Sequence, residues 1–239
     1  MKMYRQFINR IVLPSLFVFV PLQVWAECAN QETTGRYAIH AAAEDAQPLM
    51  PGMMAPEFTV MDPAGAPVEF NPASLDQPVI MTFYRGGWCP YCNLHLAEMQ
   101  EVEQKVKAMG YDIWFISVDQ PSVLAESLDE PDLEYQVLSD SDLCATRAFG
   151  VAFKIPDELV ERYLNYDIDI EGASGREHHV LPVPSTFIIG TDGIIKFAYS
   201  NPNYKVRLPP EVLEAAATVH ATDVDDRLQK QLKALRESD

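Results

Sequence analysis

The sequence FYRGGWCPYC, at residues 83–92, decides the fold of this chain. The run at residues 79–84 is apolar and rich in strand-forming residues, which predicts a short buried strand. Two glycines follow, and from Pro90 onward apolar residues recur near helical spacing. Proline suits the first turn of a helix because its missing N–H would have no partner there anyway. The stretch therefore predicts a strand, a tight turn and a helix whose first turn carries Cys89 and Cys92.

Cys89 and Cys92 indicate a redox site. The free N–H groups and the positive dipole end of a helix stabilise the thiolate, which is the reactive form of cysteine. We expect Cys89, at the helix start, to be the more exposed sulfur, and His95 to be a surface or packing residue rather than a base. A structural disulfide or half of a zinc site is the alternative, but zinc takes about four ligands and the chain has no second CxxC. The strand-to-helix context favours redox chemistry.

Residues 1–26 have the pattern of a secretory signal peptide. Lys2, Arg5 and Arg10 form a charged start, an apolar stretch follows, and small residues stand at the cleavage position. The apolar stretch is shorter than the roughly 20 residues that a spanning helix needs, which argues against a membrane anchor. We predict export to the periplasm or full secretion, where disulfides persist.

The length and the net charge of the chain limit its domain organisation and its partners. Cleavage after residue 26 would leave 213 of the 239 residues and, with three positive charges removed, would change the net charge from −17 to −20. Such an acidic chain argues against nucleic acid and anionic membrane surfaces as partners. We predict a leader at 27–50 that is mobile and contains Cys28, one domain at 51–220, and a helical tail at 221–239 that packs locally. No cofactor and no resident metal are predicted.

The remaining pattern alternates strands and helices. We predict a hairpin of strands at 55–61 and 67–70, and core strands at 111–118 and 135–138. Helices are predicted at 121–128, 142–149, 158–164 and 210–219, with a loop at 171–179 and a second hairpin of strands at 185–189 and 194–199.

This order resembles the thioredoxin fold, an α/β fold with a central mixed sheet flanked by helices, here with an N-terminal hairpin and a helical C-terminal tail. More narrowly, residues 55–199 resemble the alkyl hydroperoxide reductase/thiol-specific antioxidant (AhpC/TSA) family of peroxiredoxin-like proteins. The stretches that carry the resemblance are residues 83–92, 138–140, 149–151 and 181–189.

The resemblance implies roles for several residues. Peroxiredoxins carry the pattern PxxxTxxC, and this chain has Arg85 for that Pro and Cys89 for that Thr, so Cys92 falls on the peroxide-attacking position. The arginine that polarises the peroxide in the family falls on Pro184, where thioredoxin-like reductases have a cis-proline. We expect Arg85 to supply the positive charge instead, and Trp88 to shield the disulfide.

Two redox mechanisms follow from these roles. In an antioxidant peroxidase, Cys92 attacks a hydroperoxide, Cys89 or Cys144 resolves the sulfenic acid, and a thioredoxin-type donor reduces the disulfide. In a protein disulfide oxidoreductase, Cys89 attacks a protein disulfide and Cys92 resolves the mixed intermediate. We favour the peroxidase. A third hypothesis is a copper chaperone in which the cysteines and His178 or His179 together bind the metal. A buried Cys144 packing as a small apolar residue is the alternative to its resolving role.

Overall fold

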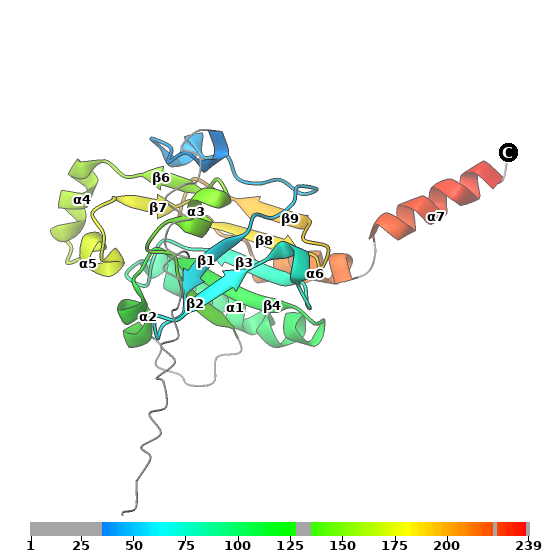
Figure 1. The fold of residues 1–239 in the computed structure, drawn as a ribbon, viewed down its shortest axis with the longest axis horizontal. Helices are drawn as coiled ribbons and strands as arrows, with labels where there is room; N and C mark the ends of the chain where they lie inside the picture. Colours follow the sequence, from blue (N-terminus) through cyan, green and yellow to red (C-terminus); the bar gives the residue numbers. More distant parts are fainter. Residues whose placement is uncertain (1–34, 128–134, 222–223, 238–239) are drawn as a thin grey trace, which may run out of the picture.

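The structure, a computed structural model, describes residues 35–127, 135–221 and 224–237 (Figure 1). The predicted signal peptide and Cys28 lie outside the described residues. No helix in the described ranges is both long and apolar enough to cross a membrane.

A mixed sheet forms the centre of the domain. In the described part of the chain it has seven strands in the order β2-β1-β5-β4-β3-β8-β9. The neighbours β3, β4 and β5 run parallel, whereas β1, β2, β8 and β9 join by antiparallel pairs. The strands are β1 (Phe58–Met61), β2 (Pro67–Phe70), β3 (Val79–Phe83), β4 (Asp112–Ser117), β5 (Gln136–Ser139), β8 (Ser185–Ile189) and β9 (Ile195–Ser200). Both predicted hairpins and the three core strands are confirmed.

Helices cover both faces of this sheet (Figure 1). Helix α1 packs with α6 on one face, and α3 lies on the other. The helices are α1 (Pro90–Ala108), α2 (Pro121–Ser127), α3 (Cys144–Ala148), α4 (Asp157–Leu164), α5 (Ile170–Ser174), α6 (Pro210–Ala221) and α7 (Val224–Glu237). Each helix predicted from the sequence is present.

The alternating side chains of β3 divide the core into two halves. Met81 and Phe83 point into a cluster that contains Cys144, whereas Ile80 points into a second cluster that contains Cys89 and Cys92. All five residues of β3 are buried, as expected for a central strand covered on both faces. The redox pair therefore lies on the α1 side of the sheet, opposite Cys144.

The predicted loop at 171–179 is wrong in its first half, where α5 forms. Asp169 caps this helix, with the Gly172 N–H donating to its Oδ1 at 2.8 Å. Gly175 ends it in the left-handed region at φ +65°. The prediction also missed a small antiparallel sheet of β6 (Ala152–Lys154) and β7 (Val180–Pro182).

The described part of the predicted mobile leader packs against the domain. The His40 N–H donates to the Ala152 carbonyl at 3.0 Å, and the Gln47 N–H donates to the Gly150 carbonyl at 2.9 Å. Leu49 is 2% exposed and joins the core cluster opposite the cysteines. The prediction is corrected for residues 35–50, because their backbone is paired and one side chain is buried.

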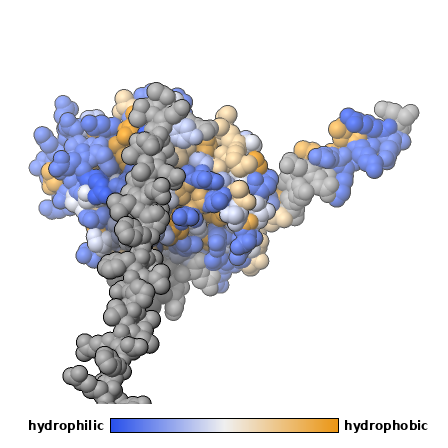
Figure 2. Space-filling model, in the orientation of Figure 1, coloured by the Kyte–Doolittle hydropathy of each residue, from blue (hydrophilic) through white to orange (hydrophobic). Residues whose placement is uncertain are grey.

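The C-terminal helix α7 extends away from the sheet (Figure 1). Figure 2 shows this helix as largely hydrophilic with scattered hydrophobic patches. Its leucines are about half exposed or more: Leu228 55%, Leu232 49% and Leu235 65%. The prediction that this apolar face packs locally is therefore wrong for the described residues. The prediction rested on the spacing of the leucines, which places them on one face of the helix. That spacing does not indicate which surface, if any, the face packs against.

Candidate active site

A strand, a glycine turn and a helix start build the site. After β3 the Tyr84 N–H still pairs with the Ile116 carbonyl at 3.0 Å. Gly86 then turns the chain at φ +148°, a conformation that is essentially restricted to glycine. Cys89 is the N-cap of α1, and Pro90 occupies the first helical position. The local geometry is the one predicted from the sequence.

Gly86 leaves no room for a side chain. A Cβ atom there would lie 2.4 Å from Trp88 Nε1 and 2.7 Å from Asp119 Oδ1. We expect Gly86→Ala to destabilise the protein by about 1–3 kcal/mol and to displace Trp88, because the backbone conformation and the contacts both oppose it. Thermal unfolding and tryptophan fluorescence measure this. The control is Gly87→Ala, whose nearest contact would be 3.9 Å, so equal losses in both variants would contradict the expectation.

Both cysteine side chains are buried. Cys89 is 1% exposed and Cys92 is 0% exposed, so the predicted difference in exposure is absent. The reason is the packing above the helix start, where Arg85 and Trp88 lie beside the pair. Both residues are thiols rather than members of a disulfide. A reactant reaches the sulfurs only when part of this cover moves.

The surroundings of the two sulfurs drive their pKa values apart. The pKa of Cys89 is lowered, first by a hydrogen bond from the Cys92 thiol and then by the positive charges of Arg85 and Arg207. The pKa of Cys92 is raised, because its proton is shared with Cys89 and because it is buried. In the reduced pair Cys89 is therefore the thiolate, at the N-terminus of α1.

Arg85 sits in an aromatic cage next to Cys89. Its Nη1 lies 3.9 Å from Cys89 Sγ, and its Nη2 donates to the Tyr163 hydroxyl at 2.5 Å. The guanidinium carbon lies 4.2 Å from the ring centre of Tyr204 and 4.9 Å from that of Trp88. The expected positions of Arg85 and Trp88 beside the pair are thus found, but the two tyrosines were not identified from the sequence.

Arg207 is a second cation at the pair, and no pattern in the sequence indicates it. Its Nη2 donates to Cys92 Sγ at 3.2 Å. His95 is 4% exposed, and its Nε2 lies 3.2 Å from the carbonyl of Leu208, the residue after Arg207. Burial and then the charge of Arg207 lower the pKa of His95 to about 4, so the ring is neutral and packs as expected.

Asp119 is a buried carboxyl group below the glycine turn. Its Oδ2 accepts from the Gly87 N–H at 2.8 Å and from Ser117 Oγ at 3.0 Å, whereas its Oδ1 is buried with no partner. Burial raises its pKa to about 6, against the lowering effect of the two hydrogen bonds. The sequence feature that could have indicated Asp119 is its position directly after a core strand. In α/β proteins, ligand and active sites lie at the carboxyl ends of such strands.

Two other predicted site residues, Cys144 and Pro184, are not arranged as their predicted roles require. Cys144 is disulfide-bonded, and it lies across the sheet from the pair. The peptide bond before Pro184 is trans, as are all the peptide bonds in the described ranges. The chain stays extended there: the Val183 N–H donates to the Val151 carbonyl at 2.8 Å, and β8 begins at Ser185. The expected cis-proline is therefore absent.

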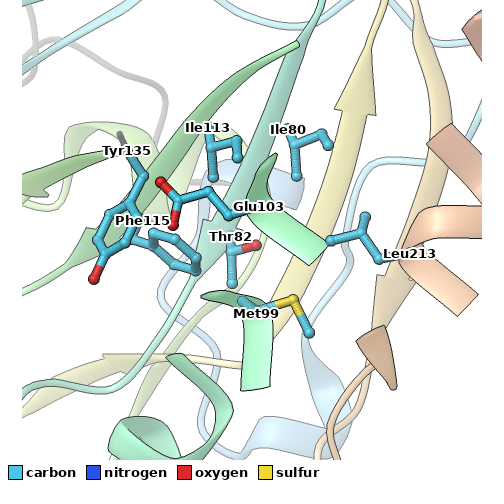
Figure 3. A pocket seen from close by; sticks show the side chains of 8 residues that line it. All are labelled: Ile80, Thr82, Met99, Glu103, Ile113, Phe115, Tyr135 and Leu213. Atoms are coloured by element: carbon cyan, nitrogen blue, oxygen red, sulfur yellow. The ribbon is translucent and has the colours of Figure 1, made fainter. Parts of the chain in front are cut away.

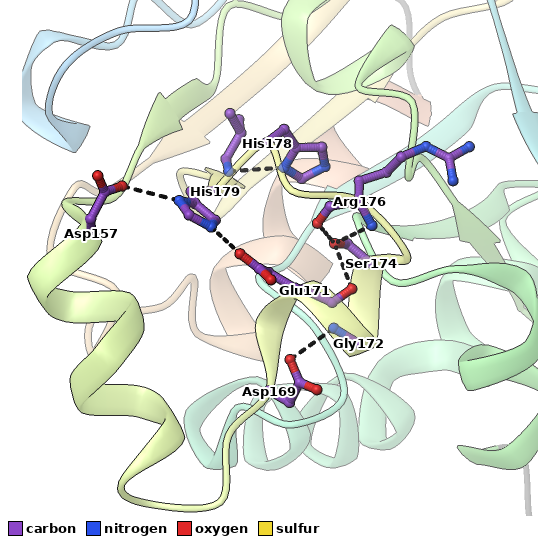
Figure 4. Close-up of polar contacts among 9 residues, drawn as sticks. Asp157, Asp169, Glu171, Gly172, Ser174, Arg176, His178 and His179 are labelled. Atoms are coloured by element: carbon purple, nitrogen blue, oxygen red, sulfur yellow. Dashed lines mark hydrogen bonds and ion pairs between the residues drawn. The ribbon is translucent and has the colours of Figure 1, made fainter.

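The two histidines of the copper reading have other partners (Figure 4). His179 Nδ1 lies 3.1 Å from Asp157 Oδ1, and its Nε2 forms a short hydrogen bond with Glu171. The His178 Nδ1 accepts from the Val180 N–H at 2.9 Å. In the described ranges neither histidine contacts the cysteine pair, and no group of three or more metal-ligating residues gathers. This arrangement does not support the hypothesis of a copper chaperone.

A separate apolar pocket lies beneath α1 (Figure 3). It encloses about 10 Å³, which is room for about one water molecule, so it is a packing defect rather than a substrate site. Its lining residues come from β3, α1, β4 and α6 and from just before β5: Ile80, Thr82, Met99, Glu103, Ile113, Phe115, Tyr135 and Leu213.

A mixed sheet with a cysteine pair at the start of its first long helix defines a thioredoxin-like fold with a dithiol site. The model of the AhpC/TSA family matches residues 51–198, more than half of the chain, and the chain belongs to that family. Peroxiredoxin Bcp of Escherichia coli K12 is 30% identical over 104 residues, which are 44% of this chain and 66%, just under two thirds, of that protein.

Solved structures agree on the fold. The peroxidoxin BcpB of Mycobacterium tuberculosis superimposes with a TM-score of 0.54 at 18% identity, over 71% of this chain and 95% of that one. The reduced Prx3 of Vibrio vulnificus, determined in complex with H2O2, gives a TM-score of 0.57 at 17% identity, over 73% of this chain and 99% of that one. At these identities the similarity concerns the fold alone.

Proposed function

We propose that this protein is a thiol peroxidase that reduces hydroperoxides through Cys89 and Cys92. The observation that carries the proposal is an arginine beside each sulfur of a dithiol at a helix start: Arg85 at Cys89 and Arg207 at Cys92. Membership of a family that includes peroxiredoxins supports it. A thioredoxin-type dithiol protein is the proposed electron donor.

Cys89 is the proposed nucleophile, although the family pattern points to Cys92. The thiolate of Cys89 attacks one peroxide oxygen, the O–O bond breaks, and the alkoxide takes the proton of Cys92 to leave as an alcohol. The Cys92 thiolate then attacks the sulfur of the Cys89 sulfenic acid, and hydroxide leaves and is protonated to water. One hydroperoxide thereby oxidises two thiols to one disulfide. The low pKa of Cys89 supports this order.

Titration of the reduced protein with hydrogen peroxide tests the proposal. We expect one equivalent of peroxide to consume two thiols, and mass spectrometry to find a disulfide within the peptide that contains residues 89–92. Loss of the free thiols of Cys89 and Cys92 without that disulfide, or no reaction with peroxide, would contradict it.

A protein disulfide oxidoreductase is the second candidate. It is favoured by the same low pKa at the first cysteine of the CxxC, which is the position that attacks a protein disulfide in that mechanism. This candidate predicts that peroxide leaves the thiols intact, while an oxidised protein substrate forms a mixed disulfide with Cys89 in a Cys92→Ser variant. Export to the periplasm or outside the cell remains a proposal for either candidate, since residues 1–26 lie outside the described ranges.

A further inference from the structure

Arg207 belongs to the segment 201–209, which connects β9 to α6 and lies over the second cysteine. The segment is fixed just after Arg207, where Leu208 is 2% exposed and its carbonyl faces His95 Nε2. Because the acceptor is a carbonyl oxygen and His95 is neutral, the ring nitrogen carries the proton and donates it. His95 therefore positions the backbone that carries Arg207.

Within the described ranges, the charge of Arg207 has no carboxylate partner. Among the described residues neither Arg207 nor Arg85 forms an ion pair with an acid, although the whole chain has a net charge of −17. The Nε and Nη1 atoms of Arg207 are also buried without an acceptor. Arg207 as a whole is only partly buried, but a cation with buried and unpaired N–H groups is costly unless a negative group compensates it. The atom that it does contact is Cys92 Sγ, at 3.2 Å.

Cys92 must carry a negative charge twice in a dithiol cycle. It is a thiolate when it attacks the sulfur of Cys89, and it is the leaving thiolate when a reductant attacks Cys89 in the disulfide. Both the complete burial of Cys92 and the neighbouring Cys89 thiolate oppose a negative charge on Cys92. Among the groups that favour this charge, Arg207 has the largest effect. Arg85 contacts the other sulfur, so each sulfur has one arginine in direct contact, although the charge of Arg207 also acts on Cys89.

We propose that Arg207 is the catalytic residue that stabilises the Cys92 thiolate during the formation and the reduction of the Cys89–Cys92 disulfide. The proposal rests on the proposed dithiol function, but it concerns the disulfide steps and not the first attack on peroxide. When a thiolate of the reductant attacks Cys89 Sγ, the S–S bond breaks and its electron pair stays on Cys92 beside Arg207. A second reductant thiol then displaces Cys89 and completes the reduction.

The first test titrates Cys92 in a Cys89→Ser background, where the competing sulfur is absent. The thiolate is followed by its ultraviolet absorbance, so the buried sulfur need not react with a reagent. We expect Arg207→Met to raise the pKa of Cys92 by about one unit or more, which is about tenfold less thiolate at a fixed pH. Arg207→Lys should keep most of the effect. Lys205→Met is the matched control, because it removes a charge from the same segment without touching a sulfur.

The second test uses the two-cysteine protein, oxidised and then reduced with dithiothreitol. We expect Arg207→Met to slow reduction about tenfold, while Lys205→Met stays within twofold of the parent and circular dichroism shows intact folding. Unchanged reduction and an unchanged pKa in Arg207→Met would overturn the proposal. Neither readout needs a peroxide, so a protein that fails to reduce hydroperoxides but passes both tests would refute the peroxidase function and keep the role of Arg207.

Discussion

Replacing Cys89 by serine is expected to reduce peroxide turnover by about a thousandfold or more, because it removes the proposed nucleophile. The replacement changes one atom in a fully covered position, so the fold should be retained. Cys92→Ser also stops turnover, but for another reason: the sulfenic acid still forms on Cys89 and has no thiol to resolve it. We expect a dimedone label on Cys89 in that variant, identified by mass spectrometry of the peptide.

The two single variants separate the possible nucleophiles. If the label appears on Cys92 in the Cys89→Ser protein, at the rate seen for the parent protein, the family pattern is right and Cys92 attacks the peroxide. The proposal that Cys89 attacks would then be wrong. The charge distribution around the pair argues for labelling of Cys89, since Cys89 has the helix N-terminus and Arg85 beside it.

Replacing Phe149 by alanine is expected to destabilise the protein by about 3–5 kcal/mol, the range for a large buried aromatic residue. Phe149 is 0% exposed, and its ring centre lies 4.9 Å from that of Phe187 and 5.2 Å from that of Phe83. It also contacts Phe58 on β1, at 5.9 Å between ring centres. The ring therefore joins α3 to three strands of the sheet, and its removal leaves a cavity.

Denaturant unfolding of the purified protein measures this loss. The control is Leu94→Ala on α1, where the side chain is 60% exposed and the change should stay within about 0.5 kcal/mol. A loss below about 1 kcal/mol for Phe149→Ala would show that the cluster between the sheet and α3 relaxes to fill the space. Comparable losses in the two variants would contradict the burial of Phe149 between α3 and the sheet.

The fold and the cysteine pair could be predicted because their signals are local. An apolar run, two glycines and a proline specify the strand, the turn and the helix start at Cys89 within residues 79–90. The helix α5 was missed because a five-residue helix is too short to show periodicity, and its cap at Asp169 was the available signal. The strands β6 and β7 have three residues each and were missed for the same reason.

The second half of the site could not be predicted, because tertiary folding assembles it. Arg207 reaches Cys92 across 115 positions of sequence, and Tyr163 reaches Arg85 across 78. Neither residue lies in a motif, and one arginine in a connecting segment has no signal that distinguishes it from a surface charge. His95 was expected to be a surface or packing residue rather than a base, but its contact with Leu208 depends on where segment 201–209 lies.

The complete burial of the dithiol is expected to make the site select reactants by molecular size. We expect a hydroperoxide of a few atoms to reach Cys89 after a small displacement of the side chains that cover it, whereas a bulky alkylating agent or a folded protein would require Arg85, Tyr163 and Tyr204 to separate. The frequency at which that aromatic cover opens would then limit the reaction with large partners, while the intrinsic reactivity of the thiolate would limit the reaction with small ones. The same thiol would thus be shielded from one class of reactant and available to another.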